Sequence, residues 1–436
     1  MSGKTNVLIV GGGGREHALA WKLRQSPNLG ELYSTDTSNP GLAELAKPIG
    51  VPYSLLEFFP IRRFCQTANV GLVVIGPEEP LAKGLADALS DSVIPGAPVP
   101  AVFGPTREAA QLESDKAWAK EIMRSASVPT AEARVFRDLE SARAFLETRE
   151  EPHVIKACGL AKGKGVFVPE TLAEANTALE RIFVKREFGD AGRTVVIEER
   201  LKGREVSIFA LVDGRSIYIL EACQDHKRLG DGATGPNTGG MGALCPTPVV
   251  DERLIETVQR DILVPTVDAL RRDGIEFRGV LYAGLMLTHA GPKVLEYNVR
   301  FGDPECQVLM RRLRGDLLDI LLATANKRLH EVEINWEPGP AVCVVLASPG
   351  YPDKPKLGVP IDGIAQANAC EGAVVFHAGT TLDKRGGVVT AGGRVLNVTA
   401  VGANLEEARA RAYRAAECIQ FPGKVFRKDI GTDVVG

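Results

Sequence analysis

The chain has 436 residues, of which 44% are hydrophobic, 25% charged and 6% aromatic, a balance typical of a folded protein with two to four domains. Its 52 Lys and Arg residues against 55 Asp and Glu residues leave a formal net charge of −3, which argues against a nucleic-acid-binding or membrane-surface protein. The first apolar run, residues 7–10, is too short for a signal peptide or a membrane span, so we expect a cytoplasmic protein.

The cysteines are too scattered for a structural metal site or a disulfide scaffold. No CxxC pair occurs, which argues against a zinc ribbon or a thioredoxin-type site. We expect reduced thiols, as is usual in a cytoplasm. The eight cysteines are Cys65, Cys158, Cys223, Cys245, Cys306, Cys343, Cys370 and Cys418.

The first hundred residues alternate strand and helix patterns. Short apolar runs predict buried parallel strands at residues 7–10, 72–75 and 101–103. A helix is expected over residues 15–25, and Leu81, Leu85 and Leu89 recur at the spacing of a second one. Alternating strands and helices indicate an open parallel sheet, whose ligands bind beyond the carboxyl ends of its strands.

Two glycine-containing turns follow the first two of these strands, at residues 11–14 and 76–80. A glycine run between a strand and a helix lets backbone N–H groups approach a phosphate at the helix N-terminus. The dinucleotide fingerprint G-x-G-x-x-G/A fails in every register, although Asp36 lies about where an NAD-ribose carboxylate would be. The pattern therefore favours phosphate binding over NAD binding, with a purely structural turn as the other interpretation.

The rest of the chain divides into a long central unit and a separate C-terminal α+β unit. Helices are expected at residues 106–127, after the Thr171 and Glu174 capping pair, at 251–272 with a kink at Pro265, and at 405–419 after Asn404. A hairpin is expected around Asp213 and Gly214. Further strands are expected at residues 153–156, 195–197, 205–212, 215–220, 280–287, 293–299, 341–347 and 392–401.

A lysine- and glycine-rich segment follows the expected strand that ends at Lys156. It contains Gly163, Lys164 and Gly165, but the spacing of a P-loop is absent. Such a loop can fold over a polyphosphate, because it offers N–H donors and positive charge. The alternative is an exposed lysine-rich hairpin.

Glu296, Asn298 and Arg300 alternate along an expected strand, so their side chains would share one face. A carboxylate and an amide oxygen suit Mg²⁺, which also keeps waters and substrate phosphate oxygens as ligands. The arginine could hold a carboxylate or a phosphate in a bidentate manner. The alternative is a strand with one solvated polar face.

Residues 223–248 show little periodicity and contain six glycines and three prolines. A loop of this length inside a compact domain is usually functional or disordered. The charged residues of its first half suit a loop that closes over a substrate, and solvated disorder is the alternative.

Several stretches together make the sequence similar to the phosphoribosylamine–glycine ligase family of ATP-grasp enzymes. They are VLIVGGGGREHALAWKL at 7–23, IGPEEPLAKGL at 75–85, QDHKRLGDGATGPNTGGMGA at 224–243, LYAGLM at 281–286, EYNVRFGDPECQ at 296–307 and AVCVVLASPGYP at 341–352. The resemblance covers nearly the whole chain.

The resemblance implies an α/β fold of three parts. Residues 1–107 would form an N-terminal Rossmann-like (pre-ATP-grasp) domain that binds substrate. Residues 108–325 would form the ATP-grasp core, with a mobile lid at about 126–193. Residues 326–436 would form a small C-terminal α+β domain.

The resemblance also implies the activity, ATP-dependent ligation of glycine to 5-phosphoribosylamine through a glycyl phosphate intermediate, in purine biosynthesis. Glu296 and Asn298 would hold Mg²⁺ or Mn²⁺. A monomer acting on small molecules, without a nucleic-acid or membrane partner, is expected. The residues implied for ATP binding are Lys116, Lys156, Gly163, Lys164, Gly165, Glu198, Glu199, Arg200, Leu201, Glu205, Arg228 and Asn237.

The remaining implied residues belong to the acceptor end and to catalysis. Arg300, Asp225 and Lys227 would be catalytic. The substrate-binding residues would be Gly13, Gly14, Arg15, Glu16, Glu78, Glu79, Gly302 and Asp303, with the phosphoribosyl phosphate at residues 13–16. The segment 281–285 lacks the extra acid that many ATP-grasp enzymes carry there, which leaves the number of metal ions open.

Three other functions compete with this interpretation. Another ATP-grasp carboxylate ligase would differ at Asp225, Arg300 or the first glycine turn. A dinucleotide-dependent reductase lacks its fingerprint and leaves the acidic cluster at residues 296–303 unexplained. A non-catalytic nucleotide-binding module would not need a metal pair, a lysine loop and an acceptor site together.

Overall fold

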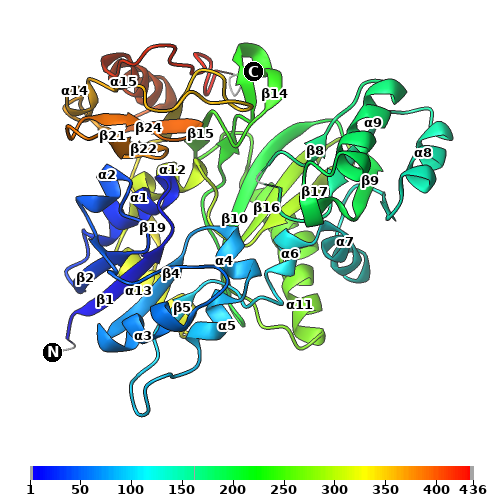
Figure 1. The fold of residues 1–436 in the computed structure, drawn as a ribbon. Coiled ribbons are helices and arrows are strands. Elements are labelled where there is room, and N and C mark those ends of the chain that lie inside the picture. Colours follow the sequence, from blue (N-terminus) through cyan, green and yellow to red (C-terminus); the bar gives the residue numbers. More distant parts are fainter. Residues whose placement is uncertain (1–2, 162, 433–436) are drawn as a thin grey trace.

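The computed structural model describes residues 3–161 and 163–432. Figure 1 shows three lobes around a centre: the N-terminal and central segments below, the C-terminal segment above, and an outer lobe at the right that carries α8 and α9. The predicted mixed α/β architecture is confirmed. None of the helices within the described ranges is both long and apolar enough to cross a membrane.

The N-terminal lobe is an open, all-parallel sheet with strand order β3-β2-β1-β4-β5. The order reverses between β1 and β4, so their carboxyl ends form a topological switch point, the usual place for a ligand. Both glycine-containing turns of the sequence lie there. Its elements are β1 (Thr5–Val10), α1 (Gly14–Leu23), β2 (Leu29–Ser34), α2 (Pro40–Ala43), β3 (Lys47–Pro48), α3 (Phe59–Thr67), β4 (Val70–Ile75), α4 (Glu78–Ala82), α5 (Leu85–Leu89) and β5 (Ala101–Phe103).

The central segment is built on an antiparallel sheet with order β11-β10-β16-β17. Its strands are β10 (Arg204–Asp213), β11 (Ile217–Ile219), β16 (Arg278–Thr288) and β17 (Gly291–Asn298). The helices that accompany it are α6 (Gln111–Ser114), α7 (Lys116–Ser125), α10 (Glu252–Val258), α11 (Val264–Arg272), α12 (Glu305–Arg312) and α13 (Leu317–Ala325).

The outer lobe has a sheet and a hydrophobic core of its own. The sheet order is β6-β9-β7-β8, and its core gathers residues such as Ile155, Leu179 and Ile197 under the two helices. Few apolar contacts therefore tie this lobe to the rest of the molecule. Its elements are β6 (Ala133–Phe136), α8 (Leu139–Glu147), β7 (His153–Ala157), β8 (Val166–Phe167), α9 (Leu172–Leu179) and β9 (Val195–Glu199).

The C-terminal lobe is built on a sheet with strand order β12-β15-β20-β24-β21, in which β12 and β15 come from an earlier part of the chain than the other three strands. Helix α15 packs on one face of the sheet and α12 on the other, as Figure 1 shows. Its elements are β12 (Gln224–Asp225), β15 (Gly242–Cys245), β20 (Ala341–Ala347), α14 (Ile364–Asn368), β21 (Ala373–His377), β22 (Thr380–Leu382), β23 (Val388–Thr390), β24 (Arg394–Val401) and α15 (Leu405–Cys418). Three short two-stranded pairings complete the fold: β22 with β23, β13 (Arg228–Gly230) with β14 (Thr234–Asn237), and β18 (Leu313–Arg314) with β19 (Asn335–Trp336).

Two expected helices are each broken into two. The helix over residues 106–127 is interrupted at Asp115, whose extended backbone starts α7 and whose carboxylate accepts a hydrogen bond from the Trp118 N–H at 3.0 Å. Asp is favoured at this capping position. The helix through the three leucines is interrupted at Gly84, which has φ +85° and separates α4 from α5. The leucines are still buried, because both short helices turn the same face to the core.

The expectation of an irregular loop over residues 223–248 is wrong. The segment contains the β13–β14 hairpin, and β12 and β15 join the C-terminal sheet through β20, about a hundred residues further along. Strands of two to four residues paired with so distant a partner leave no periodic pattern. The expected helix over residues 251–272 is present, and a π-helical turn over residues 259–263, just before Pro265, separates α10 from α11.

Candidate active site

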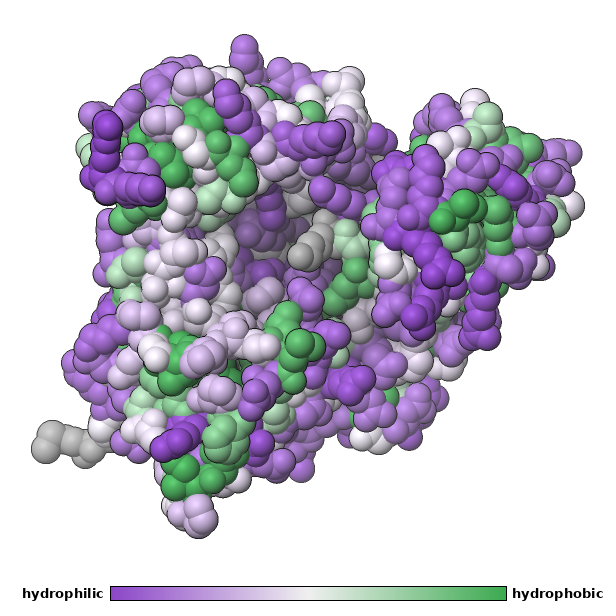
Figure 2. Space-filling model, in the orientation of Figure 1, coloured by the Kyte–Doolittle hydropathy of each residue, from purple (hydrophilic) through white to green (hydrophobic). Residues whose placement is uncertain are grey.

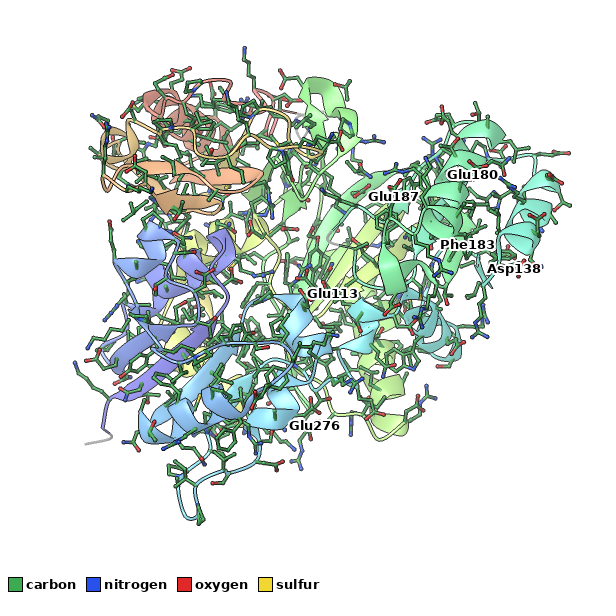
Figure 3. The ribbon with its side chains drawn as sticks, viewed as in Figure 1. Glu113, Asp138, Glu180, Phe183, Glu187 and Glu276 are labelled. Atoms are coloured by element: carbon green, nitrogen blue, oxygen red, sulfur yellow. The ribbon has the colours of Figure 1, made fainter. Side chains whose placement is uncertain are left out.

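A hollow lies at the centre of the face drawn in Figure 2, where the lobes meet, and its surface in this view is mostly hydrophilic. Figure 3 places Glu113 at this centre, between the N-terminal lobe and the central sheet. The carboxyl end of β4, through Glu78, and the end of β17 meet at Arg300, which contacts Glu113. The side chains described below come from these edges.

The first glycine turn is held by carboxylates of the protein itself. The Gly13 N–H donates to Glu16 Oε2 at 2.8 Å, and the Arg15 N–H donates to Asp303 Oδ2 at 3.3 Å. A side chain at Gly14 is excluded, because its Cβ would lie 2.1 Å from the amide nitrogen of Asn397. The turn therefore fits closely against β24 and the segment after β17, and two N–H groups predicted to face a phosphate already have protein acceptors.

Arg300 connects the N-terminal lobe to the central sheet. Its Nη2 donates to Glu113 Oε1 at 2.7 Å and to Asn298 Oδ1 at 3.0 Å. Its Nε lies 3.5 Å from a carboxylate oxygen of Glu78, which opens α4 together with Glu79 at the carboxyl end of β4. Burial opposes the charge, but the carboxylates of Glu113 and Glu78 outweigh burial and raise the pKa of Arg300 above its usual value. The guanidinium is a permanent cation at the centre of the site.

The predicted metal pair lies at the end of β17. Glu296 faces Gly284 of β16, so the position opposite it in the sheet offers no further ligand. Burial would raise the pKa of Glu296, but nearby lysines, Lys227 first, hold it below its usual value. The pair is thus an ionised carboxylate next to an amide oxygen, a donor set that suits Mg²⁺ or Mn²⁺. No group of three or more His, Cys, Asp and Glu side chains that could hold a metal occurs in the described parts of the chain.

A cluster of lysines lies beside Glu296, on the strands and helix that face it. Lys156 donates to the Leu295 carbonyl at 3.0 Å and forms an ion pair with Glu198. Lys120, which the sequence analysis did not single out, lies 2.8 Å from the other Glu198 oxygen. Lys116 begins α7 and donates to the Gly159 carbonyl at 3.1 Å, and burial lowers its pKa. The cluster offers cationic groups to a polyphosphate.

The glycine-rich loop joins β7 to β8 at the edge of the outer lobe. The Ala157 N–H donates to the Gly165 carbonyl at 2.8 Å, and the Lys164 N–H donates to the Ala161 carbonyl at 2.9 Å. Gly163 has φ +74°, a conformation that favours glycine. Lys162, the middle lysine of the predicted loop, lies outside the described residues.

The segment 198–201 links the outer lobe to the central sheet. The buried carboxylate of Glu198 forms ion pairs with Lys120 and Lys156, so it is not free to bind a ligand. Glu199 lies 3.5 Å from Lys293, and Arg200 forms two hydrogen bonds of 2.7 and 2.8 Å with Glu170. Only the backbone of this segment, with Leu201 at its end, is left for an adenine base.

Asp225 and Lys227 lie on the segment that begins with β12. Oδ1 of Asp225 is buried and makes no hydrogen bond with the described residues. Burial and the neighbouring Glu305 raise the pKa of Asp225 well above its usual value. Lys227 lies 3.1 Å from Glu205 and 4.0 Å from Glu296, and these carboxylates, Glu205 first, raise its pKa. Lys227 therefore stays charged between the two acids.

Arg228 and Asn237 pair with each other across the β13–β14 hairpin. The Arg228 guanidinium donates to the Gly235 carbonyl at 2.8 Å. Both residues are partly buried at the base of the hairpin, whose tip at residues 231–236 is exposed. The structure thus places these two predicted ATP-binding residues on the β13–β14 hairpin.

Asp303 lies between the N-terminal and C-terminal lobes. Burial would raise its pKa, but Arg394 and Arg15 hold the pKa below its usual value. Gln307 donates to Asp303 Oδ1 at 2.9 Å. A Cβ at Gly302 would lie 2.3 Å from a carboxylate oxygen of Glu305, so a larger residue there would displace that side chain. Asp303 is therefore an ionised group fixed by its neighbours.

Three models of the phosphoribosylglycinamide synthetase family match this chain: the N domain over residues 5–113, the ATP-grasp (A) domain over residues 114–306 and the C domain over residues 341–433. The chain belongs to the phosphoribosylglycinamide synthetase family. The predicted family membership and ligase class are confirmed. The predicted boundaries after residues 107 and 325 remain predictions.

Relatives of known name agree with this membership. The phosphoribosylamine–glycine ligase of Rhodopirellula baltica is 48% identical over 98% of this chain and 97% of its own, and that of Caulobacter vibrioides is 49% identical over 98% of both. The solved structure of the Thermotoga maritima ligase is 34% identical, covers 98% of this chain and 100% of its own, and gives a TM-score of 0.81. A biotin carboxylase of Hydrogenobacter thermophilus, 15% identical with a TM-score of 0.72, shares the fold.

The structure adds site residues of this synthetase that the sequence analysis missed. Glu113 holds Arg300 and also accepts from the Val299 N–H at 2.8 Å. Arg394, from β24, donates to the carbonyl groups of Gly239, at 2.6 Å, and Asp303. Glu113 lay inside an expected helix and Arg394 inside an expected strand, so no local signal marked either one. Their roles depend on contacts across 187 and 91 positions of the sequence.

Proposed function

We propose that this chain joins glycine to 5-phosphoribosylamine at the expense of ATP, giving glycinamide ribonucleotide, ADP and phosphate in purine biosynthesis. The family and the names of the relatives support this function. Within the molecule, the observation that carries it is the position of Arg300. One guanidinium contacts the proposed metal ligand Asn298 and lies beside Glu78 at the switch point of the N-terminal sheet. The nucleotide and acceptor halves of a ligase site therefore meet there.

The ATP half of the site is formed by the lysines and the segment 198–201. Lys116, Lys156 and the loop of residues 163–165 supply cationic and N–H groups to the phosphates. The backbone of residues 198–201 holds the adenine, and Glu205 accepts from the ribose hydroxyls. Arg228 and Asn237 lie on the hairpin and reach the phosphates only when the hairpin closes.

Glu296 and Asn298 hold Mg²⁺ or Mn²⁺ together with phosphate oxygens of ATP. The ion, when bound, neutralises charge on the transferring phosphoryl group. Lys227 adds a fixed positive charge 4.0 Å from Glu296. The two protein ligands are few, as is usual for Mg²⁺ sites in which the substrate completes the coordination.

Activation of glycine follows from its chemistry. A carboxylate is a poor acyl donor, because its leaving group would be an oxide. Transfer of the γ-phosphoryl group gives glycyl phosphate, from which phosphate can leave. In this proposal Arg300, a buried cation, holds the carboxylate of glycine, and Asp303, an ionised acid, holds its ammonium group.

The phosphoribosylamine nitrogen then attacks the acyl carbon and loses a proton. Asp225 accepts that proton, because its raised pKa brings it closer to the working pH of a general base. Arg300 stabilises the anionic tetrahedral intermediate. Gly13, Gly14, Arg15 and Glu16, with Glu78 and Glu79, contribute to the acceptor side, and Gly302 keeps the backbone close to Glu305.

Closure of the outer lobe excludes water from this site. Acyl phosphates hydrolyse readily, so the intermediate needs protection until the amine attacks. The separate core of the outer lobe lets it move as a body about residues 198–201. We also propose that the protein acts in the cytoplasm and as a monomer.

Oxygen-18 labelling tests the intermediate directly. Glycine labelled in its carboxylate is supplied with MgATP and phosphoribosylamine, and the released phosphate is analysed by mass spectrometry. We expect one labelled oxygen in each phosphate, because the carboxylate oxygen leaves with phosphorus. Unlabelled phosphate together with labelled glycinamide ribonucleotide would exclude a glycyl phosphate intermediate.

A further inference from the structure

Two thiols of the C-terminal lobe lie close together near its surface. The sulfur of Cys370, which follows α14, is 4.0 Å from the sulfur of Cys418, the last residue of α15. Both side chains are partly exposed, whereas the other six cysteines are buried. The proposed ligase reaction uses neither thiol.

The backbone holds these two cysteines in place. Asp362 and Gln420 exchange two hydrogen bonds of 2.9 Å, so the chain that leads into α14 is fixed beside the chain that leaves α15. Gly363 packs so closely against the Cys418 carbonyl that a Cβ there would lie 1.9 Å from its oxygen. The approach of the sulfurs is therefore a feature of the fold rather than of two side-chain rotamers.

A second close pair differs in access to solvent. Cys223 and Cys245 are neighbours as well, and burial together with the contact with Cys245 raises the pKa of Cys223, but both thiols are fully buried. An oxidant in solution reaches Cys370 and Cys418 and does not reach the buried pair. The buried pair therefore serves as a control within the same protein for the effect of solvent exposure on thiol oxidation.

We propose that Cys370 and Cys418 form a reversible disulfide when the protein meets a hydroperoxide. The thiolate of one cysteine attacks the peroxide, the O–O bond breaks, and a sulfenic acid and hydroxide form. The second thiol attacks that sulfur, an S–S bond forms, and water leaves. Overall two thiols and one H₂O₂ give one disulfide and two waters, so the thiols are oxidised and the peroxide is reduced.

The two sulfurs have similar surroundings. The Cys370 thiol donates to the Gln366 carbonyl at 3.5 Å, and the Cys418 thiol donates to the Arg414 carbonyl at 3.4 Å, so each is held by the backbone one turn earlier. Either sulfur can attack the peroxide, and the other then closes the bond.

The bond would close a loop from residue 370 to residue 418. This loop includes β21 and β24, the strands that contact the N-terminal lobe and carry Arg394. Helices α14 and α15 cover the face of the sheet opposite α12 (Figure 1), so the sulfurs lie away from the proposed active site. We therefore expect the disulfide to stabilise the C-terminal lobe without blocking the site.

Peptide mass spectrometry tests the proposal. The full-length protein is treated with one equivalent of H₂O₂, its remaining thiols are alkylated, and it is digested without reduction. We expect a linked pair of peptides that contains Cys370 and Cys418, has lost two hydrogens and separates on addition of dithiothreitol. The oxidised protein should melt roughly 2–5 °C higher than the reduced protein, because the closed loop is long.

Three variants act as controls. Cys370→Ser and Cys418→Ser should remove both the linked peptides and the shift in melting temperature. Cys158→Ser leaves the pair intact and should behave as the wild type does. Sulfinic acid on either cysteine without a linked pair, or a link between Cys223 and Cys245 instead, would overturn the proposal.

Discussion

Asp225 is the buried carboxyl group on which the proposed proton transfer depends. We expect Asp225→Asn to lower kcat by about 10²–10⁴-fold, because an amide cannot accept the proton from the amine. The dissociation constant for MgATP should change little, since the role proposed for Asp225 is in proton transfer from the amine and not in nucleotide binding. Stopped-flow phosphate release and ATP-binding titrations measure the two quantities separately.

The pH dependence of the wild type gives a second test of Asp225. Its pKa is raised, so the carboxylate form is lost at a higher pH than for an ordinary Asp as the pH falls. The acidic limb of kcat should therefore lie at a higher pH than an ordinary Asp would give and should be missing from the residual activity of Asp225→Asn. An unchanged acidic limb in the variant would assign that proton to another group.

Glu296 is the charged member of the proposed metal pair. We expect Glu296→Gln to raise the Mg²⁺ concentration needed for half-maximal activity at least tenfold, because one anionic ligand is lost. Glu276→Gln is the matched control: this half-exposed residue lies at the lower edge of the molecule, far from Glu113 in Figure 3. An equal effect of both changes would contradict the metal assignment.

At the scale of elements, the break between α6 and α7 has a functional reason. Asp115 ends one helix, caps the next and also accepts a hydrogen bond from the Cys158 thiol at 3.0 Å. The capped helix presents Lys116 and Lys120 toward the lysine cluster. A continuous helix over residues 106–127 would carry these lysines in another direction.

The effect of this cap can be separated from that of an ordinary cap. Asp115→Ala and Asp138→Ala should each cost about 1 kcal/mol of stability in chemical denaturation, because each removes a side-chain acceptor from a helix N-terminus. Only Asp115→Ala should raise the KM for ATP, since Asp115 caps the helix that carries Lys116 and Lys120, whereas Asp138 caps α8 of the outer lobe. A raised KM in both variants would mean that general destabilisation explains the change.

Local patterns were enough to predict the elements that make strong local signals. The apolar run at residues 7–10, the caps Thr171 and Asn404, and the turn near Asp213 all lie where expected. The breaks at Gly84 and Asp115 were missed, because helical periodicity continued across both positions. The strands inside residues 223–248 were missed since their partner, β20, lies far along the sequence.

In the candidate site too, local sequence patterns identified some residues, whereas tertiary contacts alone bring others into place. The alternation of Glu296 and Asn298 predicted their shared edge, but Arg300 lies beyond the end of β17 and reaches Asn298 through a hydrogen bond rather than through strand geometry. The resemblance to the family supplied the reaction. Glu113 and Arg394 could not be found, because tertiary contacts alone bring them to Arg300 and Asp303.

At the scale of the whole molecule, a pair of histidines joins the N-terminal and C-terminal lobes. The His377 N–H donates to Nδ1 of His17 at 2.9 Å, and Asn39 donates to the carbonyl groups of both His377 and Gly12. Burial lowers the pKa of His17 to about 3 and that of His377 to about 4. Both rings are therefore neutral in the folded protein.

This pair makes stability depend on pH. In the unfolded chain each histidine binds a proton below about pH 6.5, whereas in the folded protein His17 and His377 bind one only at about pH 3–4. The free energy of unfolding therefore decreases as the pH is lowered from about 6.5 to about 3–4. At pH 5 each ring should lower the free energy of unfolding by about 2 kcal/mol relative to its value above pH 6.5. Urea denaturation of His17→Gln should show a shallower pH slope, and His330→Gln, at an exposed site, an unchanged one. Equal pH slopes in the wild type and both variants would mean that the histidine pair does not cause the loss of stability at low pH.

In the proposed function, ATP, glycine and phosphoribosylamine meet in one site around Arg300. The most direct test is phosphate release from MgATP by the wild-type protein, with glycine and phosphoribosylamine supplied singly and together. We expect release well above background only when both are present, in step with the formation of glycinamide ribonucleotide. Release that neither compound stimulates, in folded protein that binds ATP, would contradict the proposed function.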